Sequence, residues 1–238
     1  MKTIGLLGGM SWESTVPYYR TINRVVGEQL GGLHSAQIVL YSIDFHEMEM
    51  LQHAERWTEA GEIVAAAARA VERAGAEFLV LCSNTMHIAA PQIERAVGIP
   101  LLHIADATAA PIKAAGLGRV GLLGTRFTME QEFYRRRLEA EHGLEVLVPP
   151  TEDREVVHRV IYDELCRGKV LESSRLRFQG FVSDLASRGA EGVILGCTEI
   201  GLLIRPADAT TPLFDTAEIH AEAAARYALA GRDATPGR

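Results

Sequence analysis

The feature that most constrains the fold is an internal duplication of the chain. Two pairs of segments match: TIGLLGG (3–9) with RVGLLGT (119–125), and GAEFLVLCSNT (75–85) with GAEGVILGCTE (189–199). The offset is 116 residues from Gly5 to Gly121 and 115 residues from Cys82 to Cys197. An offset this constant predicts two similar lobes, each about half of the chain.

Within each lobe, short apolar runs alternate with amphipathic stretches. Strands are predicted at 2–7, 37–43, 77–81, 119–123, 145–148 and 192–195. Helices are predicted from Ser14, over 55–74, after Thr85, from Thr128 with Gln131 as its capping-box partner, and over 152–167, 171–188 and 216–230. This alternation predicts an α/β protein with parallel sheets and helices on both faces. The tail, residues 231–238, lacks periodicity and is predicted to fray.

Composition excludes several classes of function. The chain has 238 residues with 24 Lys and Arg against 31 Asp and Glu, a net charge of −7, which argues against a nucleic-acid partner. No apolar run approaches the roughly 20 residues that a membrane span needs. Three widely spaced cysteines form neither a disulfide framework nor a CxxC metal pair, which favours a reducing cytoplasm. GxGxxG, P-loop and HExxH patterns are absent, so neither a nucleotide nor a metal site is predicted.

Cys82 and Cys197 each follow a predicted strand, where open parallel sheets bind their ligands. If the lobes face each other through a pseudo-twofold axis, the two thiols approach a cleft from opposite sides. One thiol could then remove a proton from a carbon while the other delivers one to its opposite face. Each cysteine precedes a predicted helix start, which would lower its pKa and provide backbone N–H groups for a carboxylate. Asn84, Thr85 and Thr198 add side-chain donors beside the sulfurs.

Two residues near the cysteines, His87 and Glu199, each leave two interpretations open. His87 could support the Cys82 thiol or cap its own helix. Glu199 could orient the site or accept from a substrate amine, or it could lie on the solvated surface. Cys166 has no counterpart in the duplication and is expected to be a packing residue or a plain surface residue.

These motifs resemble the aspartate/glutamate racemase family, a cofactor-independent group with paired cysteines, over residues 2–230. The anchors are GLLGGM (5–10), CSNT (82–85) and GCTE (196–199). Longer strings are similar to the YgeA-type broad-specificity amino-acid racemases: GGMSWEST (8–15), GGLHSAQ (31–37), DFHE (44–47), LHIADAT (102–108), GTRFTMEQEFYR (124–135) and FDTAEIHAE (214–222).

The resemblance implies two Rossmann-like lobes related by a pseudo-twofold, with the active site in the cleft between them. The lobes would be residues 1–100 plus 213–238, and residues 101–212. The protein would be an isomerase of D-amino acid metabolism, a cytoplasmic homodimer that needs neither pyridoxal phosphate nor a metal. Cys82 and Cys197 would be the acid/base pair. The substrate-binding residues would be Met10, Gln52, Ser83, Asn84, Thr85, Thr125, Thr198 and Glu199, with Asn84, Thr85 and Thr198 holding the α-carboxylate.

The chain departs from the aspartate-specific members of that family at two cations. They carry an Arg in the loop after the second strand, where this chain reads DFHEMEM (44–50), and a Lys where this chain has Cys166. Without a cation, burying a side-chain carboxylate is costly. The expected activity is therefore a broad-specificity amino-acid racemase. The alternatives are maleate isomerase, hydantoin racemase or a non-catalytic amino-acid-binding protein.

Overall fold

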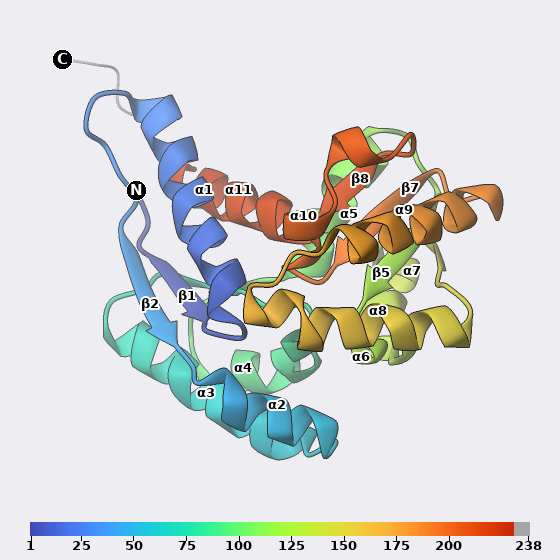
Figure 1. Ribbon diagram of the computed structural model, residues 1–238. Coiled ribbons are helices and arrows are strands. Elements are labelled where there is room, and N and C mark those ends of the chain that lie inside the picture. Colours follow the sequence, from blue (N-terminus) through green and yellow to red (C-terminus); the bar gives the residue numbers. More distant parts are fainter. Residues whose placement is uncertain (231–238) are drawn as a thin grey trace. The chain divides into compact units, whose positions relative to one another are not determined.

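The computed structural model describes residues 1–230, so the predicted frayed tail lies outside the described residues. The chain divides into two compact units (Figure 1). Unit 1 contains Met1–Cys82, Ile88–His103 and the chain from His220 onward; unit 2 contains Ser83–His87 and Ile104–Ile219. No helix among the described residues is both long and apolar enough to cross a membrane.

Unit 1 is built on a four-stranded parallel sheet in the order β2-β1-β3-β4. Its strands are β1 (Ile4–Gly8), β2 (Ile38–Ser42), β3 (Phe78–Leu81) and β4 (Leu101–Leu102). Its helices are α1 (Trp12–Leu30), α2 (Phe45–His53), α3 (Trp57–Arg73), α4 (Ala90–Ala96) and most of α11 (Thr216–Leu229). The central strands β1 and β3 are buried throughout, and α1 and α3 cover opposite faces of the sheet (Figure 1).

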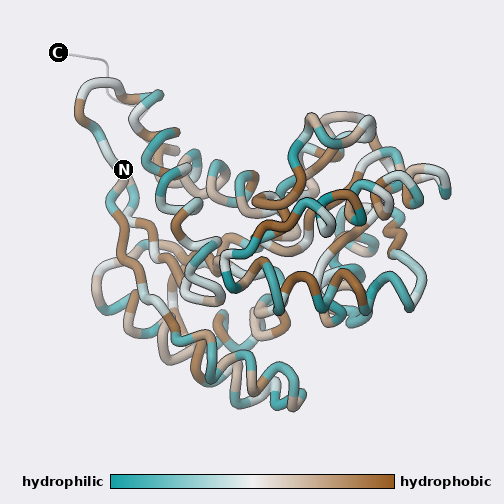
Figure 2. Tube along the Cα trace, in the orientation of Figure 1, coloured by the Kyte–Doolittle hydropathy of each residue, from teal (hydrophilic) through white to brown (hydrophobic). Residues whose placement is uncertain are grey.

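Unit 2 repeats this plan with a four-stranded parallel sheet in the order β6-β5-β7-β8. Its strands are β5 (Arg119–Gly124), β6 (Glu145–Leu147), β7 (Gly192–Gly196) and β8 (Leu213–Asp215). Its helices are α5 (Ile104–Ala114), α6 (Arg126–Glu130), α7 (Glu132–His142), α8 (Thr151–Asp163), α9 (Glu172–Ser187) and α10 (Ile200–Leu203), with 3-10 turns η2 (Leu165–Arg167) and η3 (Pro206–Asp208). Hydrophilic residues alternate with hydrophobic ones along these helices (Figure 2), as core-facing helices require.

Several predicted helix boundaries are wrong. The helix expected from Thr128 begins at Arg126, because the Thr125 hydroxyl accepts from the backbone N of Thr128 at 3.2 Å and acts as its N-cap. Gln131 ends that helix instead of closing a capping box. Helix α2 was not predicted: its apolar pattern is weak, and the Asp44 carboxylate starts it by accepting from the backbone N of His46 at 3.0 Å.

Gly9 lies between β1 and α1, at a position where a side chain would strain and crowd the backbone. It has φ of 90°, and a Cβ there would overlap the backbone O and N of Ile43. We expect Gly9→Ala to lower the free energy of unfolding by about 3 kcal/mol through strain and overlap. Gly32→Ala is the control, because Gly32 has φ of 57° but nothing within 4 Å of the added Cβ. In urea unfolding, Gly32→Ala should lower the free energy of unfolding clearly less than Gly9→Ala does. Equal losses in the two variants would show that overlap with the Ile43 backbone does not contribute.

Candidate active site

The registers of the two sheets define which residues are equivalent in the two units. Leu7 of β1 lies opposite Leu81 of β3, and Leu123 of β5 lies opposite Leu195 of β7. The duplicated glycines make Leu7 the counterpart of Leu123. Leu81 is therefore the counterpart of Leu195, and the offset for the third strand of each sheet is 114 residues.

This register corrects the expected equivalence of the two cysteines. Two residues beyond Leu81 the chain reaches Ser83, and two residues beyond Leu195 it reaches Cys197. The prediction that Cys82 and Cys197 occupy matched positions is wrong, because the backbone counterpart of Cys82 is Gly196. Side chains alternate along a strand, so a shift of one residue turns a side chain to the other face.

The segment Ser83–His87 belongs to unit 2 and lies against the carboxyl edge of its sheet. The Asn84 amide donates to Thr216 Oγ1 at 2.9 Å, and the Thr85 hydroxyl lies 2.9 Å from Thr125 Oγ1. Thr125 follows β5 and Thr216 follows β8, the two neighbours of β7 in the sheet. The segment is thus anchored on both sides of the strand that ends at Gly196, directly before Cys197.

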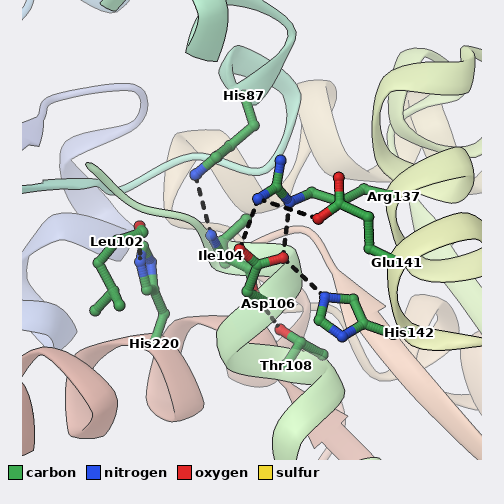
Figure 3. Close-up of polar contacts among 9 residues, drawn as sticks. All are labelled: His87, Leu102, Ile104, Asp106, Thr108, Arg137, Glu141, His142 and His220. Carbon is green, nitrogen blue, oxygen red and sulfur yellow. Dashed lines mark hydrogen bonds and ion pairs between the residues drawn. The ribbon is translucent and has the colours of Figure 1, made fainter. Parts of the chain in front are cut away.

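His87 fixes the conformation of this segment through both of its ring nitrogens. Nδ1 lies 2.6 Å from the carbonyl oxygen of Ser83, and Nε2 accepts from the backbone N of Ile104 at 3.2 Å (Figure 3). Nδ1 therefore carries the proton and donates to Ser83, while Nε2 is unprotonated. Of the two interpretations of His87, the structure supports the one in which it satisfies backbone groups.

The Cys197 thiol donates a hydrogen bond to a buried carboxylate. Its Sγ donates to Glu199 Oε2 at 2.8 Å, and the Thr198 hydroxyl donates to the same oxygen at 3.0 Å. Glu199 is only 2% exposed, so it is not a solvated surface residue. Burial raises the pKa of the Cys197 thiol well above its ordinary value, and the negative charge of Glu199 raises it further. Cys197 is therefore a thiol in the ligand-free protein.

The expectation that helix starts lower the pKa of both cysteines is wrong. Burial also raises the pKa of Cys82, which is fully buried with its Sγ directed to the carbonyl oxygen of Val80 at 3.9 Å. The helical turns that follow are short: η1 (Thr85–Ala89) has five residues and α10 has four. Such turns carry too few aligned peptide dipoles to offset the cost of burying a thiolate.

Asn84 presents an unsatisfied acceptor in the segment that flanks Cys197. Asn84 is 3% exposed, and its Oδ1 has no hydrogen-bond partner within residues 1–230. The Thr216 hydroxyl donates its proton to the carbonyl oxygen of Leu195 at 2.7 Å, so it can only accept from Asn84. This places the amide nitrogen of Asn84 toward Thr216 and leaves Oδ1 as the free atom. A free carbonyl oxygen requires an N–H or O–H donor, such as a substrate ammonium group.

The remaining predicted residues divide between the units. Unit 2 brings together seven of the ten: Ser83, Asn84, Thr85, Thr125, Cys197, Thr198 and Glu199. Met10, Gln52 and Cys82 lie in unit 1, with side chains 4%, 1% and 0% exposed. Their proposed part in the same site stays a prediction.

Sequence analysis missed Asp215 and Thr216, which lie at the end of β8 as Cys197 lies at the end of β7. Burial raises the pKa of Asp215 to about 6, and the charges of Glu218 and Glu199 contribute to that rise. Its Oδ1 caps α11 by accepting from the backbone N of Ala217 at 2.9 Å. Their place in the string FDTAEIHAE, at the start of a predicted helix, could have marked them.

Among the described residues, Asp106, Glu141 and His142 are close enough together to hold a cation. Arg137 already donates twice to the Asp106 carboxylate, at 2.7 and 2.8 Å, and His142 lies 2.8 Å from the same group (Figure 3). Burial alone would raise the pKa of Asp106, but the hydrogen bonds from Arg137 and His142 lower it below its ordinary value. The cluster joins α5 to α7, and we assign it no metal.

Comparison with known proteins defines the class to which this fold and these residues belong. A family model for Asp/Glu/hydantoin racemases matches residues 7–224. The chain belongs to that family.

Particular relatives extend the comparison. The chain is 24% identical over 221 residues to the broad-specificity amino-acid racemase RacX of Bacillus subtilis strain 168, covering 90% of this chain and 92% of RacX. It is 57% identical to a candidate Asp/Glu racemase from Yersinia pestis, with a TM-score of 0.88 over 96% of this chain and 100% of that one. An aspartate racemase homologue from Pyrococcus horikoshii OT3 is 39% identical, with a TM-score of 0.82 over 96% and 99% of the two chains.

Proposed function

We propose that this protein is a racemase of broad amino-acid specificity that inverts Cα by direct proton transfer between side chains. The observation that carries the proposal is the arrangement around Cys197: a thiol bonded to a buried carboxylate, beside a segment with one unsatisfied acceptor. In this proposal the free Oδ1 of Asn84 accepts from the α-ammonium group. The hydroxyls of Thr85 and Thr125 are hydrogen-bond donors for the α-carboxylate, whereas the Thr198 hydroxyl donates to Glu199.

Cys197 is the proposed acid/base group on one face of Cα. The Cys197 proton passes to Glu199, giving a thiolate and a carboxylic acid. The thiolate then takes the Cα proton, and the electron pair of the broken C–H bond is delocalised into the carboxylate as an enolate. The ammonium group held by Asn84 and the hydroxyl donors around the carboxylate stabilise that charge.

The group on the opposite face comes from the Cys82–Ser83 turn. The observed register favours Ser83, whose backbone is the counterpart of Cys197, and its hydroxyl is part of unit 2. Ser83 O–H would deliver a proton to the enolate carbon, and the proton held by Glu199 would then return through water to the Ser83 alkoxide, which restores the starting state of both groups. The role of Cys82 that the paired-cysteine pattern predicts stays open to the same experiment.

The proposal of broad specificity rests on the absence of two cations, the Arg and the Lys that the aspartate-specific members of the family carry. Residues 44–50 contain no Arg, and Asp44 begins α2. Cys166 lies in η2 and packs against the unit 2 core that includes Cys197. A neutral substrate side chain avoids the cost of an unpaired buried carboxylate. Homoserine, methionine and glutamine are therefore expected to react faster than aspartate and glutamate.

The test is proton NMR of L-amino acids in D₂O with the protein and no added cofactor. The panel contains homoserine, methionine, glutamine, lysine, aspartate and glutamate. Loss of the Cα proton signal together with the D-enantiomer on a chiral column supports racemisation and ranks the substrates. If the whole panel is unreactive, the proposal fails. Conversion of maleate to fumarate, or racemisation of hydantoins, would then identify one of the alternatives, and ligand binding without exchange would indicate a binding protein.

Glu199→Gln is expected to lower the pKa of Cys197, because it removes the negative charge that disfavours the thiolate. Cys197 should then react faster with iodoacetamide at neutral pH, while racemisation falls by about 10- to 100-fold for want of the proton acceptor. Alkylation is measured in a Cys82→Ala, Cys166→Ala background, so that Cys197 is the one thiol left. Glu191→Gln is the control, since Glu191 instead accepts from the backbone N of Gly118 and Arg119. Slower alkylation in Glu199→Gln would contradict the assignment.

A further inference from the structure

The hydroxyl of Thr216, the first residue of α11, joins the segment Ser83–His87 to strand β7. Thr216 is fully buried, and its hydroxyl donates to the carbonyl oxygen of Leu195 at 2.7 Å. The same hydroxyl oxygen accepts from the Asn84 amide at 2.9 Å. All three residues belong to unit 2. One buried hydroxyl group therefore connects β7, the start of α11 and the amide of Asn84.

The chemistry of the three groups fixes the direction of these two hydrogen bonds. A carbonyl oxygen has no proton to donate, so the single proton of the Thr216 hydroxyl points to Leu195. The lone pairs of the hydroxyl oxygen then accept from the NH2 group of Asn84. If the amide were turned by 180°, Asn84 Oδ1 would meet those lone pairs, and two acceptors would repel each other. Thr216 therefore determines which end of the Asn84 amide remains free.

Backbone contacts hold Thr216 in place from two sides. On the side of the sheet, the preceding residue Asp215 pairs with Leu195 in the register of β8 with β7. On the side of the helix, Asp215 Oδ1 accepts from the backbone N of Ala217 at 2.9 Å and of Glu218 at 3.3 Å, which caps the first turn of α11. Thr216 lies between these two sets of contacts, so its hydroxyl stays next to its two partners.

A free acceptor atom selects among the groups that a ligand can present to it. Asn84 Oδ1 is buried and has no hydrogen-bond partner among residues 1–230. An α-ammonium group would offer this oxygen a charged N–H donor, and an α-hydroxyl group would offer a neutral O–H donor. An α-keto group, or the alkene carbon of maleate, has no such donor and would leave the oxygen unsatisfied at a cost in affinity. The expected order of affinity is therefore ammonium, then hydroxyl, then keto.

We propose that Thr216 is a positioning residue that makes this site selective for α-ammonium acids, because it fixes the orientation of the Asn84 amide. The inference rests on the proposed racemase function and adds the residue that decides which α-substituent is accepted. Thr216 acts through Asn84 and not on the substrate itself. Its replacement should therefore change the selectivity among ligands more than it changes the proton transfers at Cys197.

Thr216→Val tests this role, since valine replaces the hydroxyl by a methyl group that neither donates nor accepts. The NH2 group of Asn84 can then face the ligand, where it repels an ammonium group. KM for the best amino-acid substrate is expected to rise about 10- to 100-fold, with a much smaller change in kcat. The α-hydroxy and α-keto acids with the same side chain, used as competitive inhibitors, should bind as well as before or better. Thr216→Ser keeps both hydrogen bonds and should retain the wild-type selectivity.

A double-mutant cycle with Asn84→Ala tests whether Thr216 acts through Asn84. In the Asn84→Ala background, Thr216→Val should raise KM little further, because the amide that Thr216 orients is absent. A merely structural role would give the same factor in both backgrounds. Thr108→Val is the matched control, since Thr108 is a fully buried threonine of unit 2 whose hydroxyl also donates to a backbone carbonyl oxygen, that of Ile104, at 2.7 Å (Figure 3). It should leave the order of the three ligands unchanged.

Isothermal titration calorimetry with the three ligands, carried out beside the turnover assay, separates this inference from the proposed function. If the wild type prefers the amino acid and Thr216→Val loses that preference, the inference holds even where no racemisation occurs. If the wild type racemises but Thr216→Val keeps the same order of affinities, or the cycle is additive, the inference is overturned. A wild type that binds the three ligands equally, or binds none, overturns it as well. Thermal melting checks the fold, and Thr216→Ala takes the place of the valine variant if that one is unfolded.

Discussion

Replacing Cys197 by alanine is expected to lower the rate of racemisation by at least about 10³-fold. The substitution removes the thiol that the structure connects to a buried carboxylate at this edge of the sheet. It also leaves Glu199 without the sulfur contact, although the Thr198 hydroxyl still donates to the same carboxylate oxygen at 3.0 Å. The fold should survive, because alanine removes a single heavy atom beside a well-anchored segment.

The measurement separates chemistry from folding. Enantiomers have equal free energies, so kcat/KM must fall by the same factor in both directions, and chiral chromatography starting from each enantiomer checks this. The Cα deuterium exchange should fall as well, since one face of the carbon has lost its base. Cys166→Ala is the matched control, because Cys166 is a cysteine of the same unit that packs against the same core. Full turnover in Cys197→Ala would refute the proposed mechanism.

The sequence predicted the architecture because the duplication and the buried apolar runs are strong local signals. Two parallel sheets follow from strands such as Ile4–Gly8 and Gly192–Gly196, whose side chains are buried on both faces. The helix that Asp44 starts was missed because its cap is one side-chain hydrogen bond with little amphipathic pattern behind it. The helix at Thr125 was misplaced by the same kind of contact.

The site could be predicted only in part, because its geometry depends on contacts between distant residues. Glu199 lies two residues after Cys197, so local spacing was enough to suggest it. The anchoring of Asn84 by Thr216 joins positions 132 residues apart, and no local pattern indicates it. The prediction that the two cysteines are equivalent was wrong for a related reason. It relied on the residue type alone, whereas equivalent positions are defined by the backbone pairing between strands.

The second large effect is expected at Ser83. Ser83→Ala should lower racemisation by about 10²- to 10³-fold, since the enolate then lacks a proton donor on the face opposite Cys197. Cys197 remains, so it can still remove a Cα proton and return a deuteron to the same face. One enantiomer should therefore continue to exchange in D₂O with retention of configuration, a signature that misfolding would not produce. The Ser83 Oγ also accepts from the backbone N of Met86 at 3.3 Å, and losing this bond costs only about 1 kcal/mol of stability.

Two companion variants decide between the neighbouring residues. Cys82→Ala is expected to racemise at nearly the wild-type rate, because its thiol is fully buried and directed to Val80 in the preceding strand β3. Ser83→Cys should retain or increase activity, since a thiol is more acidic than a hydroxyl and donates its proton more easily. The reverse result, with loss in Cys82→Ala and full activity in Ser83→Ala, would show that the paired thiols act together despite their unequal strand positions. Ser83 and Cys197 lie at equivalent positions, each two residues beyond the equivalent leucines Leu81 and Leu195, so the register favours Ser83 over Cys82 as the counterpart of Cys197.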